Sequence, residues 1–200
     1  AALGVSATEV SEELKKRVPV TISLIKARLP WGGFMEPFRA GRAPHPDWAL
    51  TAKALDLALL VRSQGIPSEA DTVAQQLVKE ARQSLYNTPI LTLRDAQAYS
   101  YLLYTLTRAG VLTTEPLEWL RQQIATNQID VRNDITRRWM GLSYALMGVT
   151  EEVKPLLTGP VTLGKTTRDE LPEYLAALRY ARDTNLVKDT LASLSSAPAQ

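Results

Sequence analysis

Three glycines divide the middle of this sequence into units of similar length, and they constrain its fold more than any other feature. Gly65, Gly110 and Gly148 each follow a run of helical composition, and they lie 45 and then 38 residues apart. A glycine just past the last turn is a common end for an α-helix. Since a short loop and a second helical run follow each glycine, the sequence predicts helical hairpins repeated about every 40 residues. Apolar side chains recur eight and four residues before the glycines: Leu57, Leu102 and Met140, then Val61, Leu106 and Tyr144.

Residues that favour helix N-termini precede the predicted helices. Ser, Thr, Asp and Asn accept hydrogen bonds from backbone N–H groups in the first turn, and a threonine with an acid three residues on forms a capping box. A first helix is predicted over 8–28 and two last helices at about 168–182 and 184–195, with 158–166 as loop or short extended chain. The other predicted starts are Asp47, Ser68, Thr92 with Asp95, Thr114 with Pro116, Asn133 or Asp134, and Thr150.

The two helices of each hairpin differ in their apolar pattern. The first members are apolar nearly all round, whereas the second members carry one apolar stripe and a polar face. A helix that is apolar all round must be covered on several sides. We therefore expect two layers, with the first members (47–64, 94–109, 134–147) inside the second members (68–85, 115–126, 150–157).

The predicted fold class is all-α, with at least eight helices and almost no strand. Helical-hairpin repeats of this kind form either an open α-solenoid or a closed α/α toroid, and the pattern fits both. We expect one helical domain over 1–195, as an α/α toroid or part of one, and a tail over 196–200. The chain begins Ala-Ala-Leu-Gly and is interpreted as processed or as a fragment of a larger chain.

Residue counts exclude several kinds of chemistry. The chain has no cysteine, which removes disulfides, thiolate nucleophiles and cysteine-based metal sites. Its one histidine, His45, leaves no multi-histidine metal site, and a Ser-His-Asp triad would need that residue. The net charge of +2 does not indicate a nucleic-acid partner, and no apolar run approaches the roughly 18 residues of a transmembrane helix. We expect no cofactor, no metal and no catalytic residue.

The segment 29–47 breaks the helical pattern with glycines, prolines and aromatics. Long irregular segments in compact domains are often functional, although a surface connector is the simpler reading. Three aromatics within ten residues are expected to anchor the segment against the helices, because burying each stabilises by about 1.5–3 kcal/mol. The candidate loop and partner-contact residues are Trp31, Gly32, Gly33, Phe34, Phe38 and Trp48.

Few acidic residues fall on the mostly apolar helices, where a glycosidase would need a carboxylate pair. Asp95 and Asp134 lie at helix starts, where capping explains them. Asp56 lies inside an apolar helix, and an ion pair with Lys53 or Arg62 is its simpler interpretation.

Two other groups of residues are interpreted as structural. The aromatic residues Tyr101, Tyr104 and Trp139 are predicted to be core rather than a ligand platform. The basic runs Lys15–Arg17 and Arg137–Arg138 are predicted to be solvated faces.

One stretch resembles a known family. WGGF, a loop, and then PDWALTAKALDLALLVRSQGI is similar to the thioester-containing domain of bacterial α2-macroglobulin-like proteins. The later stretches RDAQAYSYLLYTLTRAG, PLEWLRQQ and RRWMGLSYALMGVTEEVKPLL look like hairpins of that domain, so the likeness covers about 30–195. The resemblance implies an α/α toroid.

The family's thioester joins a cysteine and a glutamine in a C-x-E-Q motif, which this sequence lacks. No family catalytic residue is therefore carried over. The resemblance implies a non-catalytic domain of a periplasmic or secreted protease-trapping protein, whose partners are neighbouring domains of the same polypeptide and target proteases. Two alternatives stay open at this point: a free-standing helical-repeat scaffold for a protein or peptide partner, and an α/α-toroid carbohydrate enzyme that uses Asp56.

Overall fold

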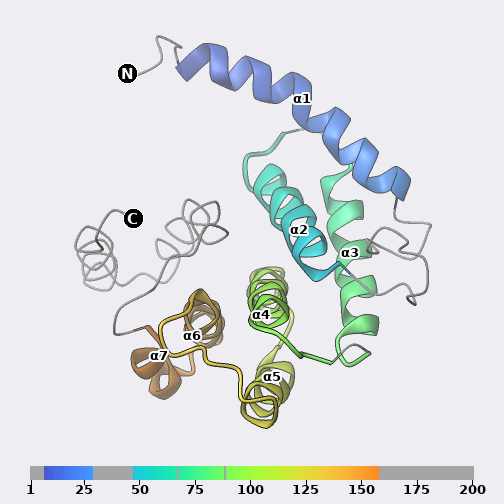
Figure 1. The fold of residues 1–200 in the computed structure, drawn as a ribbon. Helices are drawn as coiled ribbons and strands as arrows, with labels where there is room; N and C mark the ends of the chain where they lie inside the picture. Colours follow the sequence, from blue (N-terminus) through green and yellow to red (C-terminus); the bar gives the residue numbers. More distant parts are fainter. Residues whose placement is uncertain (1–6, 29–46, 67, 88, 158–200) are drawn as a thin grey trace, which may run out of the picture. The chain divides into compact units, whose positions relative to one another are not determined.

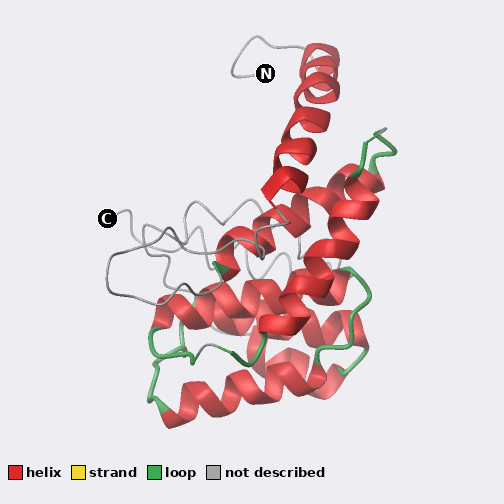
Figure 2. Cartoon of the chain, turned by 90° about the vertical axis from the view of Figure 1, so that its right-hand side faces the viewer, coloured by secondary structure: helices red, strands yellow, loops and turns green. Residues whose placement is uncertain are grey.

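The computed structural model describes residues 7–28, 47–66, 68–87 and 89–157, and this part of the chain is all helix and loop (Figures 1 and 2). The all-α prediction is confirmed for these residues, which contain no strand. The helices predicted at 168–182 and 184–195 lie outside the described residues, as does the segment 158–166. The described helices are α1 (Ala7–Arg28), α2 (Trp48–Ser63), α3 (Ala70–Ser84), α4 (Leu93–Arg108), α5 (Thr114–Thr126), α6 (Ile135–Met147) and α7 (Thr150–Leu157).

The chain forms two compact units, Ala1–Thr88 and Pro89–Gln200. In the first unit α2 and α3 pack as a hairpin, and α1 contacts both helices. Val18 and Ile22 of α1 are buried, and Lys26 near its end forms an ion pair with Glu69. The first predicted hairpin is therefore a real pair of helices with a third helix against it.

The second unit has two layers of helices. α4 packs against α6, α5 packs against α4, and α7 packs against α6 (Figure 1). Ten of the 16 residues of α4 and nine of the 13 residues of α6 are buried. Only three of 13 in α5 and one of eight in α7 are buried. The predicted alternation of buried and half-buried helices is confirmed in these two hairpins.

Several predicted helix starts are confirmed by their capping bonds. Asp47 Oδ1 accepts from the backbone N–H of Leu50 at 2.8 Å, and Asp134 Oδ1 accepts from that of Thr136 at 2.8 Å. Thr92 and Asp95 form the full capping box, because each side chain accepts from the other residue's backbone N–H. Capping therefore accounts for Asp95 and Asp134, as predicted.

Two predicted starts are wrong by one or two residues. Thr114 is the first helical residue of α5, and Thr113 holds the N-cap position without a side-chain cap bond. The Thr113 hydroxyl instead shares a buried hydrogen bond of 2.6 Å with the hydroxyl of Thr107 on α4. α3 begins at Ala70, and Ser68 Oγ accepts from its backbone N–H at 3.3 Å.

The three glycines end their helices in the same way. Gly65, Gly110 and Gly148 have φ of 63°, 87° and 78°, in the left-handed region. In each case the next residue donates its N–H to the carbonyl five residues back, which is the Schellman motif. Those carbonyls belong to Val61, Leu106 and Tyr144, with N···O distances of 3.4, 3.0 and 3.0 Å, so the apolar repeat marks a shared helix end.

A fourth helix end has the same geometry without a glycine. Gln128 follows α5 with φ 51°, and Ile129 donates its N–H to the carbonyl of Ile124 at 3.0 Å. This helix end was not predicted, because glutamine, unlike glycine, does not mark a left-handed position in the sequence. The residue after the left-handed position is β-branched in all four cases: Ile66, Val111, Ile129 and Val149.

Aromatic rings form the centre of the second unit. The Trp139 ring lies 4.9 Å from that of Tyr101 and 5.0 Å from that of Tyr104, between centroids. All three side chains are buried. The prediction that they are core is confirmed, and they fix how α6 packs against α4.

Candidate functional site

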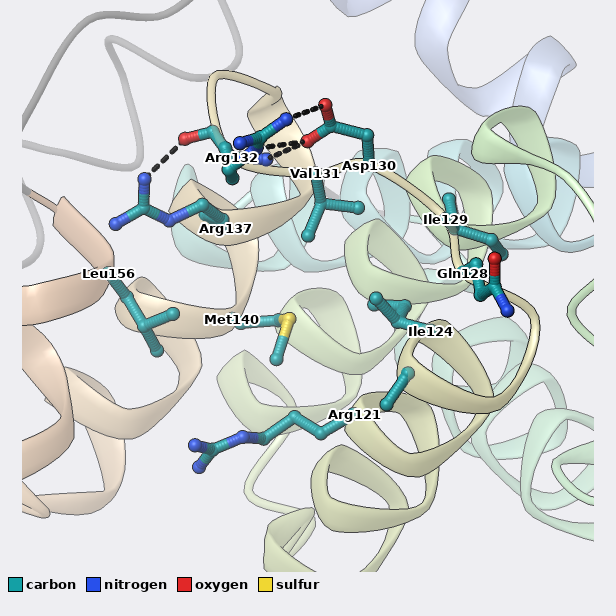
Figure 3. Close-up of a pocket in the computed structure, with 11 residues that line it drawn as sticks. Arg121, Ile124, Gln128, Ile129, Asp130, Val131, Arg132, Arg137, Met140 and Leu156 are labelled. Carbon is teal, nitrogen blue, oxygen red and sulfur yellow. Dashed lines mark hydrogen bonds and ion pairs between the residues drawn. The ribbon is translucent and has the colours of Figure 1, made fainter.

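A pocket of about 550 Å³ opens on the second unit, formed by α5, the loop to α6, α6 and the last turn of α7 (Figure 3). Its floor is apolar: Ile124, Ala125, Ile129, Val131, Met140 and Leu156. Its polar lining consists of Arg121, Gln128, Asp130, Arg132 and Arg137. The guanidinium groups of Arg121 and Arg137 lie on the side of the pocket where Leu156 lies. The site thus combines apolar surface with a rim of three arginines.

The helix end at Gln128 shapes the pocket. The left-handed residue turns the chain away from α5, so that Ile129 and Val131 can line the same space as Ile124. Asn127 holds this loop, because its side-chain Nδ2 donates to the carbonyl of Ile90 at 2.7 Å.

Asp130 neutralises one rim arginine. Arg132 Nε donates to Asp130 Oδ1 at 3.0 Å and Nη2 donates to Oδ2 at 2.8 Å, in a two-point ion pair. The backbone N–H of Arg132 also donates to Oδ1, at 3.1 Å. These bonds favour the carboxylate and lower the pKa of Asp130 to about 2, and in return they raise the pKa of Arg132.

Arg137 and Arg138 do not form a solvated basic face as predicted. Arg138 is 2% exposed and donates Nη1 to the carbonyl of Leu156 at 3.2 Å. Arg137 donates to the carbonyls of Arg132 and Pro155. The last carbonyls of a helix have no partner within the helix, and these two arginines supply donors to the end of α7. Within the described part of the chain, Arg137 donates to these carbonyls and to no carboxylate.

Arg121 belongs to a network across three helices. Its Nη1 lies 3.2 Å from Glu118 Oε1 on α5 and 3.1 Å from Glu152 Oε2 on α7. The Tyr144 hydroxyl on α6 donates to Glu118 Oε1 at 2.8 Å. Burial, followed by the bond to Glu118, raises the pKa of Tyr144 to about 12. Burial alone would lower the pKa of Arg121, but the bond with Tyr144 and the two carboxylates outweigh it, so that pKa is raised.

The structure describes two of the loop and acid candidates from the sequence, Trp48 and Asp56, and neither lines this pocket. Trp31, Gly32, Gly33, Phe34, Phe38 and His45 lie outside the described residues. Trp48 is described and is 5% exposed, in the first turn of α2, where it contributes to the core. Asp56 is half-buried on α2, and Arg62, one of the two partners predicted for it, forms a 3.2 Å ion pair with Asp71.

The sequence did not indicate a site role for Arg121, Arg132 or Arg137, and it predicted Arg137 to belong to a solvated face. Arg121 and Arg137 lie 16 residues apart on different helices, and Arg132 lies in the loop between them. The available signal was weak: three arginines around a predicted helix–loop–helix junction. Only the packing of α5, α6 and α7 brings them to one opening.

No group of three His, Cys, Asp or Glu side chains in the described ranges is placed to hold a metal ion. No helix in those ranges is long and apolar enough to cross a membrane.

Comparison with known proteins adds no relative. No family model, no curated protein and no solved structure matches the chain.

Proposed function

We propose that this chain is a non-catalytic helical domain of an α2-macroglobulin-like protease-trapping protein, and that it works by docking to other protein domains. Two arguments support the proposal. The sequence resemblance covers the helical hairpins, and the second unit stacks two such hairpins in two layers. The complete domain is proposed to continue this arrangement as an α/α toroid in a periplasmic or secreted protein.

The arginine-rimmed pocket is the observation that carries the docking proposal. Protein interfaces are enriched in arginine and methionine, and their centres are apolar. The pocket combines Arg121, Arg132 and Arg137 with Met140 and an aliphatic floor. This composition suits contact with a partner surface.

A second surface on α1 supports the same proposal. Val20 and Leu24 are one helical turn apart and are 60% and 64% exposed. They lie within the first helix, which, with the adjacent aromatic segment, we propose as the face that meets neighbouring domains. When a protease cleaves the parent protein, rearrangement of those domains is the proposed working step.

Two observations test this function: the coding sequence that flanks this chain in the parent gene, and hydrogen exchange in the parent protein before and after proteolysis. We expect the coding sequence on both sides to encode β-sandwich domains, whereas helical repeats continuing on both sides would favour a free-standing scaffold. In the parent protein, cleavage by trypsin should change amide hydrogen exchange on the surface of this domain. Unchanged exchange throughout the domain would contradict docking.

The carbohydrate-enzyme alternative has its own test. Measurable glycoside hydrolysis by the chain that is lost in Asp56→Asn would overturn the non-catalytic proposal. The matched control is Asp71→Asn, since Asp71 is an exposed acid on α3 paired with Arg62.

A further inference from the structure

We propose that the arginine-rimmed pocket binds an acidic, apolar segment of a partner protein, with aliphatic side chains on its floor and a carboxylate against Arg137. This inference rests on the proposed docking function and names the chemistry of the docked segment. The segment is a short stretch in which a glutamate or aspartate adjoins leucine-like residues.

The charges around the pocket single out Arg137. Arg132 is neutralised by its two-point pair with Asp130, and Arg121 is held by Glu118 and Glu152. Arg137 makes its two hydrogen bonds to backbone carbonyls, which carry no net charge. A guanidinium has five N–H donors, so three remain for a ligand. A carboxylate is the group that best accepts from these remaining N–H donors, because it forms short charge-assisted hydrogen bonds with a guanidinium.

The apolar floor of the pocket requires that the docked segment also carry apolar side chains. Leu156 lies on the side of the guanidinium groups of Arg121 and Arg137, and Met140 and Ile124 extend the apolar lining away from them (Figure 3). A volume of about 550 Å³ lies within the roughly 300–1,000 Å³ of ordinary ligand pockets, and it has room for apolar side chains. Met140 is buried and closes the base of the pocket, whereas Ile124 and Leu156 are half-buried and offer the accessible apolar surface.

The local charge balance favours a peptide over a polyanion. Glu118 and Glu152 pair with Arg121, and Asp130 pairs with Arg132, so the rim is close to neutral apart from Arg137. A nucleic acid or a highly charged lipid surface would meet these carboxylates as well as the arginines. A segment with one carboxylate and several apolar side chains meets Arg137 and the floor without that repulsion.

A fluorescence-polarisation titration of the full 200-residue chain tests the proposal. The probe is the labelled peptide Gly-Ser-Leu-Leu-Glu-Leu-Ser-Gly, and its partner probe has glutamine in place of glutamate. We expect saturable binding of the acidic probe and about tenfold weaker binding of the glutamine probe, as for the loss of one charge-assisted hydrogen bond. Arg137→Gln should weaken binding of the acidic probe by a similar factor and leave the affinity for the glutamine probe unchanged.

The matched control is Arg82→Gln, an exposed arginine on α3 of the first unit, which should leave both affinities unchanged. Circular dichroism checks that each variant keeps its helices. Ile124→Gln, which replaces half-buried aliphatic surface of the pocket with an amide, should weaken binding of both probes. Together these variants separate the carboxylate contact from the apolar contact.

The inference would be overturned if the acidic probe showed no saturable binding, or if the two probes bound with equal affinity. Equal losses of affinity in Arg137→Gln and Arg82→Gln would also overturn it. So would binding of the fatty acid dodecanoate in place of the peptide. A gain in affinity on neutralising Asp169 and Glu170 would also overturn it, by assigning the pocket to the chain's own acidic segment. If the inference fails while proteolysis of the parent still changes exchange on α1, docking stands without this pocket. If exchange changes nowhere in the domain, the proposed function fails as well.

Discussion

The hydroxyl of Tyr144 on α6 donates a 2.8 Å hydrogen bond to the carboxylate of Glu118 on α5. Tyr144 is 1% exposed, whereas the Glu118 side chain is 51% exposed, so the bond joins the core to the surface. The same carboxylate oxygen pairs with Arg121, which also reaches Glu152 on α7. One chain of contacts therefore ties α5, α6 and α7 together at the helices that form the pocket.

Tyr144→Phe should lower the free energy of unfolding at neutral pH by about 1 kcal/mol, since it removes one part-buried hydrogen bond and leaves the ring. The free energy of unfolding at alkaline pH gives a second measurement. Because folding raises the pKa of Tyr144 from 10.0 to about 12, its contribution is complete below pH 10 and is lost as the pH rises towards 12. Urea unfolding at neutral and alkaline pH should show this loss in the wild type and a smaller loss in the variant.

The double variant Tyr144→Phe with Glu118→Gln is the control for that prediction. If the two groups act through their shared bond, the double variant should be less destabilised than the sum of the single variants. A Tyr144 phenolate that forms with an ordinary pKa, seen by absorbance difference against Tyr144→Phe, would contradict the prediction.

Gly141→Ala should destabilise the protein by about 1–3 kcal/mol, although alanine is the better helix former. A Cβ at this position of α6 would lie 2.7 Å from Leu157 Cδ2 and 3.0 Å from Leu156 Cβ, so α7 would have to move away. Equilibrium urea unfolding measures the effect. In a Leu157→Ala background the added methyl group should cost much less, and an equal cost in both backgrounds would show that the α6–α7 contact is not the cause.

Gln128→Gly should stabilise the protein by about 0.5–1 kcal/mol. A side chain in the left-handed region costs energy that glycine avoids, although glycine also gains entropy in the unfolded chain. The reverse change at the equivalent position, Gly148→Ala, should destabilise the protein by a similar amount. The φ of Gly148 is 78°, and an added Cβ would meet no other atom, so the backbone conformation is the only source of strain. Thermal and urea unfolding of the two variants check the pair, and a destabilised Gln128→Gly would contradict the proposed strain.

Asp130 should titrate with a pKa near 2, below its ordinary value of 3.8. Since pairing with Arg132 lowers the pKa, the ion pair is complete above that ordinary value and is lost as the pH falls through about 2. NMR of the side-chain carboxyl carbon should follow this titration. In Arg132→Ala the pKa should return towards 3.8, and an unchanged value would assign the shift to another group.

The positions and ends of the helices were largely predictable from the sequence, because they depend on groups close together in the chain. The Asp47 cap and the Thr92–Asp95 box join residues three apart, and the bond after Gly110 spans five. The burial of α4 and α6 was predictable as well, since their apolar residues leave no face for water. The predicted cap of α5 was wrong because the Thr113 hydroxyl bonds side chains of other helices, Thr107 on α4 and Met147 Sδ on α6, in place of a backbone N–H of α5.

The pocket depended on tertiary structure alone. Arg137 and Arg138 are adjacent in sequence, and only the placement of the α7 carbonyls buries Arg138 and leaves Arg137 at the rim. Gly141 is an ordinary small residue until α7 packs against it. Hydrogen bonds within a helix turn are encoded by near neighbours, whereas side chains such as Tyr144 and Glu118, 26 residues apart, meet only after the helices have packed. The sequence by itself therefore determined the helices and their buried faces, and the packing of α5, α6 and α7 decided the site.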